Sequence, residues 1–187
     1  MRYPAFLLLL LLPTAALAHP GHGPGVGDSF AHGLAHPLLG VDHLIAMVAI
    51  GVLAALSGGR ARWAVPGAFL TGMAVFGLIG VGGAESALAE HVIIASIILL
   101  GVAIAVRMRL PAIALAAMAV VFGAAHGYAH GSEGTGDLGY LVGFMLSTAA
   151  LHGAGYALGH LIASRPQLVT RGTGGAIALA GLALSVA

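Results

Sequence analysis

The sequence predicts an all-α integral membrane protein, a bundle of six transmembrane helices that follows a cleaved signal peptide. The first observation is composition: of 187 residues, 59% are hydrophobic and only 7% are Asp, Glu, Lys or Arg, whereas a soluble domain carries about 25% charged residues. So little charge cannot cover a globular surface, which excludes a soluble enzyme, a disordered tail and a nucleic-acid-binding protein. The second observation is a series of apolar segments of about 20 residues, the length that crosses a lipid bilayer.

The first 18 residues have the pattern of a secretory signal peptide. Arg2 is followed by a short apolar run and then by the small-x-small cleavage motif Ala16-Leu17-Ala18. The alternative is an uncleaved first membrane helix, but the apolar run ends at Pro13 and is too short to span. We therefore expect residues 1–18 to be removed, leaving a His-rich periplasmic N-terminal segment over residues 19–35.

Residues 36–187 form the predicted transmembrane domain. Its six apolar segments are 36–57, 63–82, 87–106, 110–131, 138–162 and 172–187. The arginines that follow the signal peptide lie only in alternate loops: Arg60, Arg62, Arg107, Arg109, Arg165 and Arg171. The positive-inside rule makes these loops cytoplasmic. The sequence therefore predicts a multi-pass protein of a bacterial inner membrane, with its N-terminus in the periplasm.

Ionisable side chains inside the apolar segments are functional candidates, because each costs about 2.5–3.5 kcal/mol to insert. The segment 36–57 contains a His-x5-Asp-His pattern. On one continuous helix, a single stripe would hold His32, His36, His43 and Met47. Asp42 lies off this stripe, so we expect it to orient a histidine or to ligate metal after local unwinding. The alternative is a set of histidines whose nitrogens are satisfied by backbone carbonyls.

The end of segment 110–131 carries a second cluster. His126, His130 and Glu133 are spaced i, i+4 and i+7, which places them on one helix face. Two imidazoles and a carboxylate form a ligand set for a divalent metal ion. Glycines recur every fourth residue at 123, 127 and 131, a pattern that lets another helix pack closely. A purely structural role for this glycine face is compatible with metal binding.

Other residues are secondary candidates along a metal pathway. Glu90 lies farther into its apolar segment than Glu85, which we interpret as a surface carboxylate. His152 lies in the middle of segment 138–162 and His160 near its cytoplasmic end, so they would continue the path below the outer cluster; a hydrogen bond to a neighbouring helix is the alternative for His152. Phe69 and Met73 are the only candidates of segment 63–82, with ordinary packing as the alternative.

Two further histidines lie at the start of the mature chain. His19 and His22 could chelate metal together with the free amine, or could be incidental in a flexible exported tail. The chain contains no cysteine, so the donors favour a divalent ion with a preference for imidazole: Ni²⁺, Co²⁺, Zn²⁺ or Cu²⁺. We expect the metal ion to be a substrate and no prosthetic group to be bound. The absence of a G-x-x-x-x-G-K-[ST] motif predicts secondary or facilitated transport.

The two motifs, His36-Pro-Leu-Leu-Gly-Val-Asp42-His43 and His126-Gly-Tyr-Ala-His130-Gly-Ser-Glu133, resemble those of the HupE/UreJ family of nickel permeases. The similarity covers the whole chain; one departure is Ala125, where the family has Phe. It implies an inner-membrane secondary permease, not an enzyme, that imports Ni²⁺ or Co²⁺ from the periplasm for the maturation of hydrogenase or urease. The implied metal ligands are His36, Asp42, His43, His126, His130 and Glu133.

The rival interpretation is an intramembrane zinc-dependent hydrolase. In it, three histidines would hold Zn²⁺ while Asp42 or Glu90 acts on a bound water. A non-transporting metal sensor is a further alternative. A hydrolase needs a closed site, whereas a permease needs ligands along a path, and His152 and His160 continue toward the cytoplasm. This arrangement favours the permease.

Overall fold

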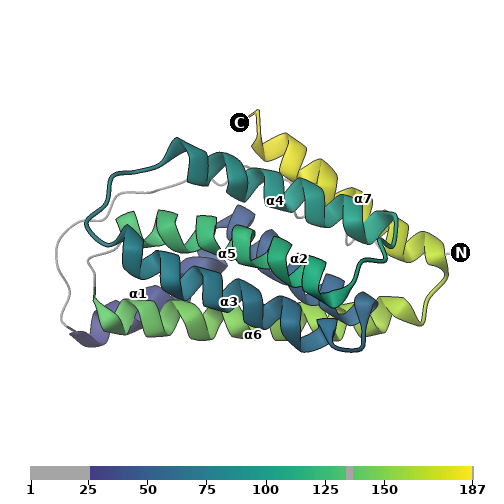
Figure 1. Ribbon diagram of the computed structural model, residues 1–187, viewed down its shortest axis with the longest axis horizontal. Helices are drawn as coiled ribbons and strands as arrows, with labels where there is room; N and C mark the ends of the chain where they lie inside the picture. The colour runs from purple at the N-terminus through teal and green to yellow at the C-terminus, as the bar shows by residue number, and fades with distance from the viewer. Residues whose placement is uncertain (1–25, 134–136, 187) are drawn as a thin grey trace, which may run out of the picture.

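The computed structural model describes residues 26–133 and 137–186, and these form helices joined by short loops, with no strand among them. The helices are α1 (Val26–Leu39), α2 (Val41–Ser57), α3 (Ala61–Gly80), α4 (Ala87–Ala105), α5 (Ala112–Glu133), α6 (Leu138–Ala163) and α7 (Gln167–Leu184). Figure 1 shows them as one bundle. The predicted all-α class is confirmed. The predicted signal peptide, His19 and His22 lie outside the described residues.

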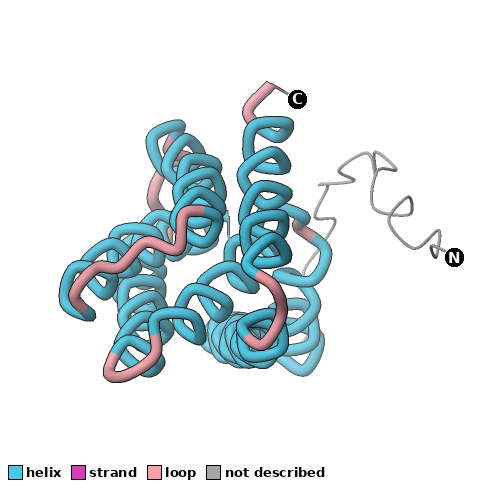
Figure 2. The backbone as a smooth tube through the Cα atoms, turned by 90° about the vertical axis from the view of Figure 1, so that its right-hand side faces the viewer, coloured by secondary structure: helices cyan, strands magenta, loops and turns pink. Residues whose placement is uncertain are grey.

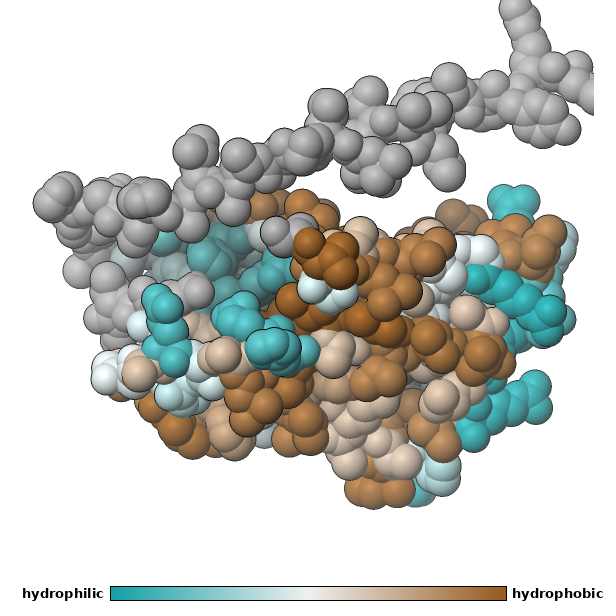
Figure 3. Space-filling view, turned by 90° about the horizontal axis from the view of Figure 1, so that it is seen from above, coloured by the Kyte–Doolittle hydropathy of each residue, from teal (hydrophilic) through white to brown (hydrophobic). Residues whose placement is uncertain are grey.

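Four helices, α3 to α6, are each long and apolar enough to cross a membrane, and α1 with α2 makes a fifth span if the pair is taken together. Figure 3 shows the broad hydrophobic face that a bilayer would cover. The chain is therefore a multi-pass membrane protein. The predicted sixth span is α7, which is 18 residues long and begins at Gln167 rather than at residue 172. It is less apolar than α3, α4, α5 and α6, which are the four long candidate spans.

The prediction of one continuous helix over residues 36–57 is wrong. Two helices meet there at Gly40 and are bent by 79° relative to each other. Pro37 lies inside α1 and has no amide hydrogen to donate, and Gly40 has an extended backbone (φ −84°, ψ 114°) from which α2 begins. The predicted single stripe is consequently divided: His32 and His36 belong to α1, whereas His43 and Met47 belong to α2.

The α3–α5 pair packs backbone against backbone. A Cβ atom on Gly123 would lie 2.1 Å from the carbonyl oxygen of Phe69, and one on Gly127 would lie 2.2 Å from that of Met73. Only glycine permits so close an approach, which confirms the small-residue face predicted for α5. The packing holds α5 and its histidines directly against α3.

The arginine-bearing loops gather at one end of the bundle. The α2–α3, α4–α5 and α6–α7 connections lie together at the right of Figure 1, and Figure 2 looks onto this end. The α3–α4 connection lies at the opposite end, where α5 also finishes. The bundle therefore has one arginine-rich end, and α5, which carries the second histidine motif, finishes at the opposite end.

Candidate metal centre

The structure brings together histidines from both sequence motifs. His36 comes from α1, His43 from α2, and His126 and His130 from α5; we call these four residues the histidine cluster. The ring centroid of His130 lies 4.8 Å from that of His36 and 4.3 Å from that of His43. The rings of His43 and His126 are 5.4 Å apart. Three helices thus converge on one group of imidazoles, and one of them, α5, is distant in sequence from α1 and α2.

Exposure of these rings falls with depth in the bundle. His32 is exposed and lies 5.9 Å from the half-buried His36. His43 and His130 are buried, and His126 has no exposed surface. The histidines therefore form a continuous series from the surface of the molecule to its interior.

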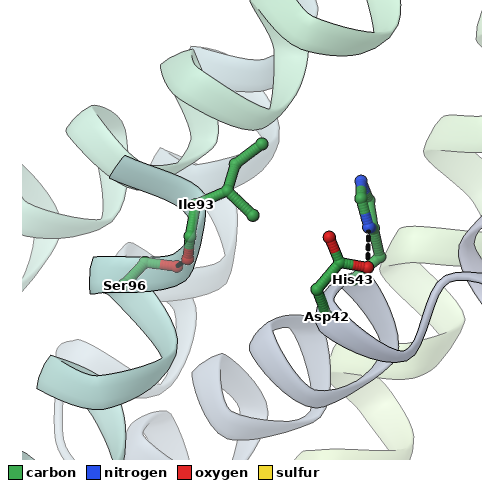
Figure 4. A network of polar contacts seen from close by, with 4 residues as sticks. All are labelled: Asp42, His43, Ile93 and Ser96. Atoms are coloured by element: carbon green, nitrogen blue, oxygen red, sulfur yellow. Dashed lines mark hydrogen bonds and ion pairs between the residues drawn. The ribbon is translucent and has the colours of Figure 1, made fainter. Parts of the chain in front are cut away.

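Asp42 orients the imidazole of His43. Nδ1 of His43 donates a hydrogen bond to Oδ1 of Asp42 over 2.6 Å, as Figure 4 shows at the start of α2. When Nδ1 carries this hydrogen, the lone pair of the neutral ring is on Nε2. A carboxylate in this position also raises the basicity of a metal-binding imidazole. Asp42 thus makes the orienting contact that the sequence suggested.

His126 is oriented in the same way by backbone. Its Nδ1 lies 2.8 Å from the carbonyl oxygen of Phe122 one turn earlier, and this carbonyl accepts the Nδ1 hydrogen. Nε2 of His126 and Nε2 of His43 are both buried and have no hydrogen-bond partner among the described residues. Leaving a buried polar atom unpaired costs about 1–3 kcal/mol. Backbone carbonyls therefore account for only one nitrogen of His126, and the other is free to bind a ligand.

The cluster does not form a closed metal site. Within the described residues, no three His, Asp or Glu side chains already constitute a group that could hold a metal ion. Glu133 is the last residue of α5, and its side chain lies outside the described part of the structure. The arrangement differs from a structural zinc site, which has four ligands around one ion.

Phe69 connects the histidine cluster with a deeper histidine. Its buried ring lies 5.2 Å from the ring of His126 and 5.1 Å from that of His152. His152 is only 3% exposed, and neither of its ring nitrogens has a hydrogen-bond partner among the described residues. The hydrogen bond to a neighbouring helix, which was the alternative for His152, is therefore not found there.

Several predicted pathway residues lie away from the cluster. Glu85 is exposed in the loop before α4, and Glu90 is exposed in the first turn of α4. Met47 belongs to the hydrophobic core, and the sulfur of Met73 accepts a hydrogen bond from the Thr148 hydroxyl. His160 is exposed near the arginine-rich end, 4.6 Å from the ring of Tyr156. Met73 lines the same cavity as His130, whereas the structure does not bring Glu85, Glu90 or His160 to the cluster.

Two aromatic residues of α6 border the histidines, and sequence reasoning missed both. Phe144 lies 4.4 Å from His130, and Tyr140 lies 5.9 Å from His36. Together with His130 they line a cavity of about 80 Å³. Aromatic residues in an apolar segment are usually core residues, so the only available signal was their i, i+4 spacing at the start of the segment.

Comparisons with known proteins identify the family of this chain. A model of the HupE / UreJ protein family matches residues 7–184. The chain is 38% identical over 185 residues to Protein HupE of Rhizobium leguminosarum bv. viciae, which covers 96% of this chain and 95% of the relative. No solved structure matches. The chain belongs to the HupE/UreJ family.

Proposed function

We propose that this protein is an inner-membrane secondary permease that imports Ni²⁺ or Co²⁺ from the periplasm for hydrogenase or urease maturation. The observation that carries the proposal is the buried histidine cluster, in which two oriented Nε2 atoms lack partners among the described residues. Imidazole suits both ions. Membership of the HupE/UreJ family supports a role in transport.

The order of the histidines supports transport rather than hydrolysis. An ion that enters past the exposed His32 and the half-buried His36 meets increasingly buried imidazoles. These would replace its water molecules one at a time. Conduction requires sites weak enough to release the ion, and a cluster that is not closed around one point meets this condition. A hydrolase would need three ligands fixed on one zinc ion.

Phe69 and His152 provide the next step. The aromatic ring contacts both His126 and His152, so it lies next to both the cluster and the deeper histidine. His152 then offers two unpaired nitrogens in an otherwise apolar environment. We assign His152 as an inner transit ligand on the way to the arginine-rich end, which the positive-inside rule makes cytoplasmic.

The test is uptake of radiolabelled nickel by cells that express single variants. His43→Ala and His126→Ala should abolish uptake at every nickel concentration, because the ion loses the ligands that replace its water. His91→Ala is the matched control, since His91 is exposed on α4 and should leave uptake unchanged. Adding unlabelled Co²⁺ or Zn²⁺ as competitor would identify the preferred ion.

Immunoblots of the membrane fraction should show equal amounts of the three variants. If excess nickel fully restores uptake in the His43 and His126 variants, these residues only concentrate metal. The transit site proposed for the histidine cluster would then be wrong.

A further inference from the structure

A second cavity lies at the arginine-rich end of the bundle, opposite the histidine cluster. It has a volume of about 410 Å³ and lies between the end of α2, the end of α4 and the connection that follows α4. Its lining includes Leu53, Ser57, Ile104, Arg107 and Arg109. Small-molecule sites have volumes of about 300–1,000 Å³, so this cavity is large enough for a ligand group.

The cavity is positively charged and its charge is not neutralised by the protein. Arg107 and Arg109 are both exposed at its rim, and no arginine forms an ion pair within the described residues. Asp42, the acidic residue of α2, lies in the first turn of that helix, whereas the cavity borders its last turn. An arginine pair without a carboxylate attracts an anion and repels a metal cation.

The backbone at Arg107 has an unusual conformation. Its φ angle is +51°, and among the described residues it is the only non-glycine with positive φ; the others are Gly58, Gly59 and Gly82. Glycine is the usual residue where a helix ends in this conformation, because other residues are sterically disfavoured there. Arginine is therefore an unusual residue at this position of the cavity rim.

The inner walls of the cavity are apolar. Leu53 and Ile104 are buried below the arginines, while Met108 and Leu110 line the cavity from its exposed edge. Figure 3 shows hydrophilic side chains gathered at this end of the molecule, next to the hydrophobic face. A cationic rim above apolar walls, where the apolar helices α2 and α4 end, matches a phospholipid better than a free anion.

We propose that this cavity binds the phosphate of an anionic phospholipid, with Arg107 and Arg109 on the phosphate oxygens and Met108 and Leu110 against the start of the acyl chains. Arginine forms paired hydrogen bonds with phosphate. Basic pockets between transmembrane helices are known to hold such headgroups. The site is separate from the histidine cluster and does not depend on the proposed permease function.

The experiment measures thermal unfolding of the full chain in a neutral detergent. Phosphatidylglycerol near saturation should raise Tm by about 5–10 °C, whereas phosphatidylcholine should not. Arg107→Gly combined with Arg109→Gln should lose most of this increase. Glycine suits the backbone at residue 107, so this variant keeps its fold. Arg165→Gln with Arg171→Gln is the matched control, because it removes two arginines outside the cavity and should respond like the unmodified protein.

A second variant makes the test independent of the arginines. Ser57→Glu adds a negative charge to the rim at an exposed position and should also reduce the increase in Tm. Inorganic phosphate that reproduces the whole increase would identify free phosphate as the ligand and overturn the lipid assignment. Equal loss in the cavity variant and in the control pair would overturn the site, because it would show only a response to overall charge.

Discussion

At the scale of single residues, Asp42 contacts the imidazole of His43, and we propose that it acts on a metal ion through His43 rather than by direct contact. The hydrogen bond of 2.6 Å fixes which nitrogen of His43 carries the lone pair. His126 receives the same orientation from the carbonyl of Phe122. The carboxylate adds a negative charge that the backbone carbonyl lacks, so the two imidazoles should differ in how strongly they bind a metal ion.

We expect Asp42→Asn to weaken metal binding without removing it. The amide oxygen can still accept the Nδ1 hydrogen, but the charge that strengthens the imidazole is lost, and such changes lower metal affinity by about 10- to 100-fold. In the uptake assay, the nickel concentration for half-maximal uptake should rise by that factor while the maximal rate changes little. Complete loss of uptake at all concentrations would instead assign Asp42 as a direct ligand.

Sequence reasoning identified the residues of the cluster but not their surroundings. An imidazole in an apolar segment is costly and therefore conspicuous, which is why both motifs could be recognised. Tyr140 and Phe144 carry no such signal, because an aromatic side chain in a membrane helix fits ordinary packing equally well. Phe69 was a pathway candidate, with ordinary packing as the alternative. The contacts of these three aromatic residues with His126, His36 and His130 depend on how α3 and α6 pack, which local sequence does not determine.

At the scale of elements, the bend at Gly40 decides how the first motif is presented. A Cβ atom on Gly40 would lie 2.9 Å from Nδ1 of His43 and 3.0 Å from Oδ1 of Asp42. The absent side chain thus leaves room for the pair of residues that follows the bend. A straight helix would have placed His36 and His43 at a fixed spacing along one axis.

Gly40→Ala should therefore impair uptake while the fold is kept. The new methyl group has to displace the His43 ring or the Asp42 carboxylate, and both are movable side-chain ends. We expect weaker nickel uptake with a Tm close to that of the unmodified protein. Gly67→Ala is the control, because nothing lies within 4 Å of the corresponding Cβ position. Unchanged uptake in Gly40→Ala would show that transport does not depend on the present geometry of Asp42 and His43.

A different result is expected for the α3–α5 contact. Gly127→Ala would place a methyl group 2.2 Å from the backbone oxygen of Met73, and backbone cannot move aside as a side chain can. Such overpacking costs about 1–3 kcal/mol, so Tm should fall by several degrees. Gly153→Ala, with nothing within 4 Å of its Cβ position, should be neutral or slightly stabilising because alanine favours the helix. Equal Tm values would contradict the close packing.

Helix positions were predictable from the sequence where apolar runs are continuous. The predicted segments 63–82, 87–106, 110–131 and 138–162 differ from α3, α4, α5 and α6 by at most two residues at either end. The bend at Gly40 was not predicted, because the direction of α1 depends on its packing against α6. A Cβ atom on Gly33 would lie 2.1 Å from the carbonyl oxygen of Tyr140. This tertiary contact involves residues far apart in the sequence.

At the scale of the whole molecule, the two ends differ in charge, and this asymmetry sets the expected orientation. The chain has no cysteine, so single cysteines can report which end faces outward. Cysteine at Ala84, in the α3–α4 loop, should react with an impermeant thiol reagent added to intact cells whose outer membrane has been opened. Cysteine at Ser164, in the α6–α7 loop, should not. Both positions are exposed in the structure.

The same assay tests whether α7 crosses the bilayer. Val186 is 87% exposed beyond the end of α7. With six spans and an outer N-terminus, cysteine at Val186 should react from outside as cysteine at Ala84 does. Protection of residue 186 together with labelling of residue 84 would leave five spans, with α7 on the cytoplasmic side.

The glycine contacts of α5 also limit what can move during transport. Because Gly123 and Gly127 rest directly on the backbone of α3, these two helices cannot slide or roll past each other without a steric clash. His126 and Phe69, one on each helix, therefore keep a constant mutual position and act as a stationary frame. The helices on either side of Gly40 are held against α6 by equally close contacts, because a Cβ atom on Gly33 would lie 2.1 Å from the carbonyl oxygen of Tyr140 and one on Gly155 would lie 2.1 Å from that of Val48. A change in the spacing of the imidazoles would therefore require α1, α2 and α6 to move together relative to α3 and α5.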